Sequence, residues 1–134
     1  MSGDTPGGDP TLEANKRTVL AFYDAGLNRK DFAAASRLIG TRYVQHNPLI
    51  GDGIEGFRGF LRYLKEAFPG LRAEIKNIFA DGDFVIAHVH GTREAGDRGS
   101  AIVDIFKLEG GKIVEHWDVI QPIPAAAANP NGMV

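Results

Sequence analysis

All four histidines of this chain fall in segments whose alternating pattern predicts β-strands, and each has polar neighbours where apolar residues would be usual. These segments are residues 43–47, 84–91 and 113–119. Because alternate residues of a strand share a face, His116 lies on the face of Asp118, and His88 lies on the face of His90. An imidazole next to a carboxylate can transfer protons near neutral pH if that face borders a cavity.

Composition narrows the possible classes of protein. The 134 residues are 43% hydrophobic and 24% charged, which is typical of one soluble globular domain. A net charge of −2 without a basic cluster argues against a nucleic-acid partner, and the apolar runs are too short for a membrane span. The start lacks the pattern of a signal peptide, so a cytoplasmic location is expected. The absence of cysteine excludes disulfides and thiol nucleophiles.

The first half of the chain is predicted to be helical. Residues 1–8 are rich in Gly, Asp and Pro and are expected to be mobile, so the domain is predicted to span residues 9–134. A first helix begins at Asp9-Pro10, and a second covers about residues 30–39. A third begins at the capping box Asp52-Gly53-Ile54-Glu55 and ends before Pro69.

From residue 71 onward the hydrophobic pattern has a period of two. Strands are predicted at residues 71–80, 84–92, 99–108 and 112–121, with tight turns at 81–83 and 109–111. Three helices followed by a four-stranded antiparallel meander make an α+β fold.

Several short motifs resemble those of the SnoaL-like polyketide cyclase family, in the nuclear-transport-factor-2-like (NTF2-like) superfamily. They include Tyr43-Val44-Gln45-His46-Asn47-Pro48, His88-Val89-His90-Gly91-Thr92 and Gly111-Lys112-Ile113-Val114-Glu115-His116-Trp117-Asp118. The resemblance covers roughly residues 10–134. It implies an NTF2-like cone, in which three N-terminal helices pack on a curved, mostly antiparallel sheet around a pocket.

The resemblance also implies a function. SnoaL-like cyclases catalyse aldol cyclisation without a cofactor, and related proteins catalyse isomerisation or other enolate chemistry on apolar, carbonyl-bearing substrates. By its place in the Glu-His-Trp-Asp motif, Asp118 corresponds to the catalytic base, with His116 and Asp104 as further candidate catalytic residues. The alternative is a non-catalytic small-molecule binding or dimerisation module on the same fold, because one fold serves many functions.

A second set of residues is predicted to contact the small apolar ligand. It comprises His46, His88, Gln45, Tyr23, Phe57 and Phe60. The two aspartates pose a problem of register. A two-residue hairpin at Gly110-Gly111 places Asp104 on the opposite face from Asp118, and only a β-bulge would bring both to one cavity.

Metal and nucleophilic chemistry receive less support. His88 and His90 could contribute to a facial metal site, but no spacing motif accompanies them, so neither a metal nor a cofactor is predicted. The serines, at positions 2, 36 and 100, do not lie in a Gly-x-Ser-x-Gly elbow.

A homodimer is expected, because three helices can cover only one face of the sheet. Val85, Ala87 and Val89 are assigned to the opposite, outer face, where two copies would pack. The charged residues 72, 74 and 76 share that face and weaken the case. The tail from Pro122 is expected either to cross to the partner or to close the pocket.

Overall fold

The computed structural model describes residues 10–134, so the predicted mobile segment and the expected N-cap Asp9 lie outside the described residues. Its elements follow in chain order. They are α1 (Pro10–Phe22), the π-helical segment η1 (Tyr23–Asn28), α2 (Phe32–Ser36), β1 (Ile39–Gln45), α3 (Gly53–Ala67), β2 (Arg72–Asp81), β3 (Phe84–Thr92), β4 (Ser100–Glu109) and β5 (Lys112–Pro122). The predicted α+β class is confirmed.

The sheet has five strands in the order β1-β5-β4-β3-β2, because the predicted four-stranded meander is joined by β1, which overlaps the predicted segment 43–47. Strands β2 to β5 form the expected antiparallel meander, while β1 pairs with β5 in parallel. The second helix ends at Ser36 because the chain after it joins the sheet: the N–H of Ile113 donates to the carbonyl of Leu38 at 2.9 Å. The edge strand β1 therefore combines the end of the predicted helix 30–39 with most of the predicted extended segment 43–47.

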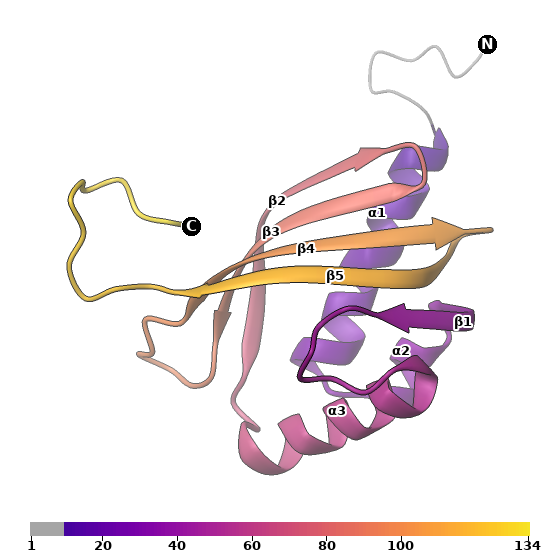
Figure 1. Cartoon of the computed structure of the whole chain (residues 1–134), viewed down its shortest axis with the longest axis horizontal. Helices are drawn as coiled ribbons and strands as arrows, with labels where there is room; N and C mark the ends of the chain where they lie inside the picture. The colour runs from indigo at the N-terminus through magenta and orange to yellow at the C-terminus, as the bar shows by residue number, and fades with distance from the viewer. Residues whose placement is uncertain (1–9) are drawn as a thin grey trace.

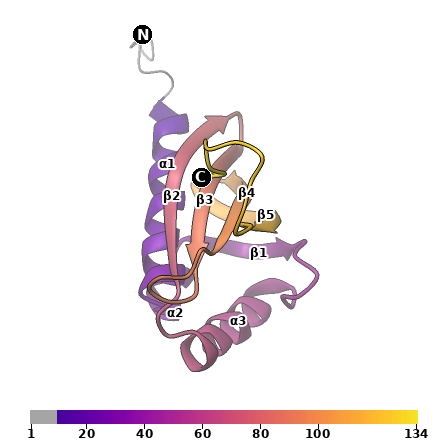
Figure 2. The same ribbon diagram turned by 90° about the vertical axis from the view of Figure 1, so that its left-hand side faces the viewer.

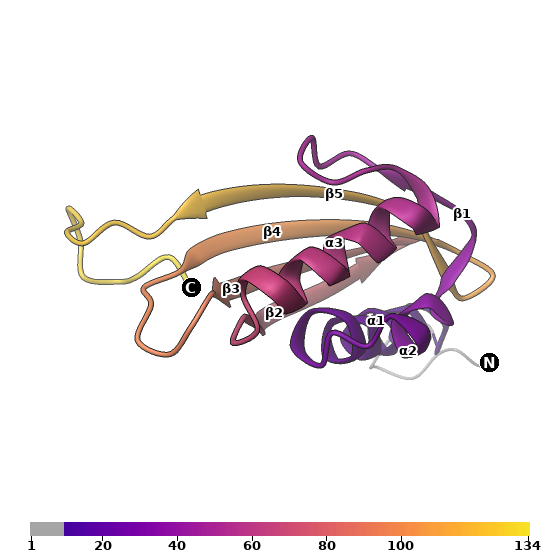
Figure 3. The ribbon, with the colours of Figure 1, turned by 90° about the horizontal axis from the view of Figure 1, so that it is seen from below.

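The helices lie on one side of the curved sheet (Figures 1 and 3). Figure 2 shows α1 running beside β2, with α3 below β1 at the other end of the layer. No helix within residues 10–134 is long and apolar enough to cross a membrane.

The core lies between this helical layer and the concave face of the sheet. Phe22 of α1 stacks on Phe57 of α3 at 5.4 Å between ring centroids and meets the ring of Phe106 edge-on at 5.7 Å. Leu61 and Val19 are likewise buried there. The helical and strand halves of the sequence therefore meet in one apolar cluster.

The assignment of the two sheet faces in the sequence analysis was wrong. Val85, Ala87 and Val89 are completely buried in the core, so they do not form an outer face. The opposite face of the sheet carries an outer patch, which we define as the exposed apolar residues Phe79, Phe84, Val103 and Val119. Both faces of β3 are partly apolar, and burial under the helices selected the face with the smaller side chains.

The outer patch leads us to expect a homodimer in which two copies pack their sheets against each other. Val119 is 71% exposed and Phe79 is 59% exposed, which is unfavourable for neighbouring apolar groups on one surface. Light scattering should give a mass near twice 14.5 kDa. Val119→Asp should shift the mass to that of the monomer, since it would bury a charge, whereas Leu20→Asp on α1 should not. A wild-type mass near 14.5 kDa would contradict the dimer.

The C-terminal tail stays close to the end of its own sheet, where Figure 1 shows it turning back after β5. The N–H of Ile123 donates to the carbonyl of Gly99, and the ring of His88 bonds to the carbonyl of Met133 at 2.8 Å. Because His88 lies on the outer face, the end of the tail does not close the cavity on the concave side. Exchange of the tail between subunits stays a prediction.

The start of α3 differs from the predicted capping box. The side chain of Asp52 makes no capping bond and instead accepts the N–H of Gln45, the last residue of β1, at 2.8 Å. Gly56 lies so close to Gly51 that an added Cβ would overlap the Gly51 carbonyl. These two contacts hold the loop between β1 and α3, which carries part of the candidate site.

Candidate functional site

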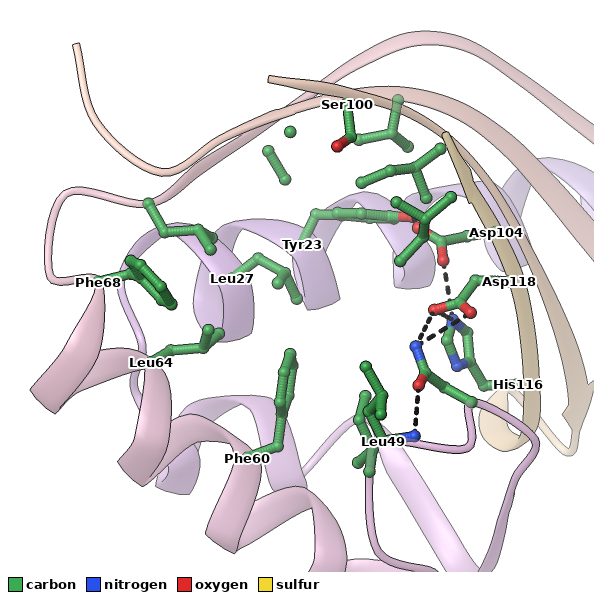
Figure 4. Close-up of a pocket in the computed structure, with 18 of the residues that line it drawn as sticks. Tyr23, Leu27, Leu49, Phe60, Leu64, Phe68, Ser100, Asp104, His116 and Asp118 are labelled. Atoms are coloured by element: carbon green, nitrogen blue, oxygen red, sulfur yellow. Dashed lines mark hydrogen bonds and ion pairs between the residues drawn. The ribbon is translucent and has the colours of Figure 1, made fainter. Parts of the chain in front are cut away.

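A cavity of about 570 Å³ lies between the helices and the concave face of the sheet (Figure 4). Its walls are mainly apolar. The apolar lining includes Phe22, Leu27, Phe60, Leu64, Phe68 and Ile102. An apolar cavity of this size with a few convergent polar groups is typical of a small-molecule site.

Asp104, His116 and Asp118 point into one end of this cavity from neighbouring strands (Figure 4). The β-bulge that would bring both aspartates to one face is present. Lys107 pairs with Glu115 but Leu108 pairs with Ile113, which leaves one extra residue in β5. As a result, Asp104 lies directly opposite Asp118 across the β4–β5 ladder.

Hydrogen bonds fix the ring of His116 and locate its protons. The oxygen Oε1 of Gln45 accepts the backbone N–H of Asn47 at 3.0 Å, so the same oxygen faces Nδ1 of His116 at 2.8 Å as an acceptor. Nδ1 therefore carries a proton. Nε2 lies 2.8 Å from Oδ1 of Asp104, which places a second proton between these two atoms.

Asp104 has both of its oxygens engaged within the site. Oδ1 faces His116, and Oδ2 accepts the hydroxyl of Tyr23 from η1. Burial, together with the negative charge of Asp104, raises the pKa of Tyr23 well above its ordinary value. Burial and the same carboxylate also raise the pKa of Tyr43, against a weaker opposing effect of its bond to Gln45.

These two tyrosines should make the protein less stable in alkaline solution. Their folded pKa values are raised, so above about pH 10 the unfolded chain loses phenolic protons that the folded chain retains. Stability then falls with rising pH by about 1.4 kcal/mol per pH unit for each tyrosine. Tyr23→Phe should reduce this slope in urea unfolding, while Tyr63→Phe, on the exposed side of α3, should not. If the slope is unchanged in Tyr23→Phe, the folded protein does not hold the phenolic proton of Tyr23 more tightly than the unfolded chain does.

Asp118 is held differently from Asp104. Its two oxygens accept the side-chain amide of Asn47, at 3.1 and 2.9 Å, and Oδ2 lies 3.9 Å from Nε2 of His116. Asn47 is itself fixed, because its Oδ1 accepts the N–H of Leu49 at 2.9 Å. The carboxylate is thereby oriented while lone pairs remain available on the side of the cavity.

Three of the predicted ligand-contacting residues line the cavity, and three do not. Tyr23, Gln45 and Phe60 line it, whereas Phe57 is buried in the core beside it. The prediction for His88 is wrong: it lies on the outer face, bonded to Asn77 and to the tail. His46 also lies outside, with its ring stacked on Trp117 at 4.8 Å and Nε2 at 2.7 Å from Glu115.

The sequence reasoning did not select Tyr43 or Asn47 as site residues, although both line the cavity. Both belong to the quoted motif around Gln45, so the signal was present. Tyr43, Gln45 and Asn47 alternate along the edge strand and its extension, and this places them on one side.

The same cluster has the composition of a possible metal site. Asp104, His116 and Asp118 each offer one ligand atom, and these atoms lie within 4.8 Å of one another. One imidazole and two carboxylates suit a divalent cation. Each of these side chains already has a hydrogen-bond partner within the protein, so the geometry is equally accounted for by proton sharing.

The fold is shared with solved structures at low sequence identity. A candidate polyketide cyclase of Bacillus cereus matches with a TM-score of 0.70 and 21% identity, covering 84% of this chain and 80% of that one. IdmH, a candidate polyketide cyclase of Streptomyces antibioticus, matches with a TM-score of 0.66 and 22% identity, covering 79% of this chain and 91% of that one. A candidate ketosteroid isomerase of Kribbella flavida matches with a TM-score of 0.67 and 18% identity, covering 90% of this chain and 85% of that one.

A comparison with curated proteins gave no significant match. The sequence profile of the SnoaL-like domain matches residues 19–116, which include most of the helical layer, β1 to β4 and the start of β5. This match spans well over half of the chain and agrees with the resemblance found in its motifs. The chain belongs to the SnoaL-like domain family.

Proposed function

We propose that this protein catalyses proton transfer at a carbon next to a carbonyl group of an apolar small molecule, without a cofactor. The observation that carries the proposal is the position of Asp118. Its oriented carboxylate stands at the end of an apolar cavity, next to an imidazole whose protons are already placed. Aldol cyclisation and isomerisation both begin with this step.

The two carboxylates would have different tasks. Asp104 is occupied by Tyr23 and His116, so it serves to orient the imidazole and to balance its charge. Asp118 retains free lone pairs and would accept the proton from carbon. The proton between Nε2 of His116 and Asp104 offsets the repulsion between two carboxylates that face each other across the ladder.

The developing enolate needs a hydrogen-bond donor near its oxygen. Tyr43 lines the cavity, and its hydroxyl accepts Nε2 of Gln45 at 3.3 Å. Among residues 10–134, the hydroxyl of Tyr43 donates to no acceptor, so its hydrogen is available to a ligand. A phenol keeps this proton near neutral pH, and the raised pKa of Tyr43 extends that range to more alkaline solution.

The names of structural neighbours support the same class of chemistry. Two are candidate polyketide cyclases and one is a candidate ketosteroid isomerase. At identities of 18–22% these structures support the fold. The proposed proton transfer rests on the arrangement of Asp118 and His116 in the cavity.

Deuterium exchange tests the proposal without knowledge of the natural substrate. A panel of apolar ketones and 1,3-dicarbonyl compounds is incubated with the protein in D2O, and loss of the α-proton NMR signal is followed at a pH where uncatalysed exchange is slow. Exchange that persists in EDTA supports the cofactor-free reaction. Exchange that requires added Mg²⁺ or Zn²⁺ would favour the metal site, and binding without exchange would favour a non-catalytic carrier.

A further inference from the structure

The end of the cavity away from the carboxylates is basic. Arg72, at the start of β2, and Arg93, just after β3, both line the cavity, together with the hydroxyl-bearing Thr92 and Ser100. The register places their backbones at neighbouring strand ends, because Arg72 pairs with Thr92 and the adjacent Gly91 pairs with Ser100. Three neighbouring segments, at the start of β2, the end of β3 and the start of β4, thus place polar residues at one rim of the cavity.

Neither guanidinium forms a close ion pair with another residue of the described part of the chain, although the charge of Arg93 acts on nearby Asp97. Within residues 10–134, no carboxylate lies within 4.0 Å of the side-chain nitrogens of Arg72 or Arg93. The guanidinium of Arg93 lies 4.5 Å from the ring centroid of Phe68, which supports its position without satisfying its donors. Glu94 and Asp97 border a neighbouring hollow with Arg93 but do not line the cavity itself.

A third cation lies behind this rim. Lys30 is buried, and its Nζ donates to the carbonyl oxygens of Leu71 at 2.8 Å and Asn28 at 3.4 Å. Among residues 10–134, no carboxylate lies within 4.0 Å of this nitrogen. Burial, followed by the charge of Arg72, lowers the pKa of Lys30. The described residues behind the rim thus place a further donor there and no carboxylate that would pair with Lys30.

The backbone of β4 gives the scale of the separation between the two ends of the cavity. Ser100 and Asp104 lie on the same face of β4, four residues apart, which corresponds to about 13 Å at 3.3 Å per residue. Ile102 lies between them on that face of β4 and lines the cavity. Leu64 of α3 and Phe68, just after α3, line the other side (Figure 4). An anionic group would be repelled by the two aspartates and attracted to the arginines.

We infer that the substrate is an elongated, apolar carbon acid with a carboxylate at its far end, and that Arg93 and Arg72 bind this carboxylate. The inference rests on the proposed function, since the arginines would set which end of the substrate reaches Asp118. An arginine can bind a carboxylate with two parallel hydrogen bonds, so charge and geometry both favour the pairing. The two arginines are thereby specificity-determining residues.

Binding of a matched pair of ligands tests the inference. One ligand is an aryl ketone with a terminal carboxylate about 13 Å from its carbonyl, and the other is its methyl ester. Calorimetry should show that the wild type binds the acid about tenfold more tightly than the ester, as expected for one charge-assisted interaction. Arg93→Met should reduce this preference to about twofold or less, and Arg93→Lys should restore part of it.

The controls separate charge recognition from folding and from catalysis. Arg62→Met, an exposed change on α3 outside the cavity lining, should keep the tenfold preference. Arg72→Met gives a second, independent variant, and circular dichroism confirms folding. Equal binding of acid and ester by the wild type, or no binding of either, would overturn the inference. Deuterium exchange measured on both ligands reports separately on the proposed function, because exchange without charge preference leaves that function standing.

Discussion

Asp118→Asn is expected to lower the rate of enzyme-catalysed deuterium exchange at least about 100-fold, the usual contribution of a positioned general base. Asparagine has nearly the same shape, and its amide oxygen can still accept the side-chain N–H of Asn47. What it cannot do is accept a proton from carbon. The ligand should still bind, because the apolar walls of the cavity are unchanged.

The matched control is Asp81→Asn, which makes the same chemical change on an exposed residue at the end of β2. Its exchange rate should equal that of the wild type. If Asp118→Asn lowers the rate by less than tenfold while its melting curve is unchanged, Asp118 is not the base. Asp104 would then be the next candidate, since it is the other carboxylate at that end of the cavity.

Much of this site followed from the alternation of residues along the predicted strands. His116 and Asp118 were placed on one face by their spacing alone, and the structure confirms that placement. The position of Asp104 depended on one extra residue in β5, and hydrophobic patterning does not locate a bulge. The register predicted from the sequence placed the two aspartates on opposite faces, and the observed pairing of β4 with β5 places them on one face.

The choice between the two faces of β3 could not be made from local pattern. One face offers Phe84 and Ile86, and the other offers Val85 and Val89, so both are apolar enough for a core. A bulge between Ile75 and Asn77 also changes which residues in the first part of β2 face inward. His88 was assigned to the cavity because the face that it shares with Phe84 and Ile86 was taken as the concave one, whereas Val85, Ala87 and Val89 are the buried residues.

The edge strand β1 was predicted only in part, as the segment 43–47, and its earlier start and its pairing with β5 were not predicted. It is short and pairs in parallel with β5, more than 70 residues later in the chain. Its hydrogen-bond partners come from tertiary structure, which local sequence does not encode. The consequence is functional, because β1 and the loop after it carry Tyr43, Gln45 and Asn47 into the site.

Asp104→Ala is expected to lower the free energy of unfolding by about 3 kcal/mol, the usual cost of removing one partner from a buried ion pair. Asp104 is 7% exposed and is the acceptor for both Tyr23 and His116. Without it, the Tyr23 hydroxyl and Nε2 of His116 are left buried without that partner. Urea unfolding measures the loss, and Asp81→Ala on the surface should change stability by less than about 0.5 kcal/mol.

A double-mutant cycle assigns the loss to its cause. If the Tyr23–Asp104 bond is a large part of it, Asp104→Ala should cost less in a Tyr23→Phe background, with a coupling energy of about 1 kcal/mol or more. Asp104→Asn should cost less than the alanine change, since its amide oxygen can still accept the Tyr23 hydroxyl. A loss below about 1 kcal/mol in Asp104→Ala would contradict the structural role. It would indicate that His116 can take Asp118, 3.9 Å away, as its partner, and that relief of repulsion between the two facing carboxylates offsets the lost hydrogen bonds.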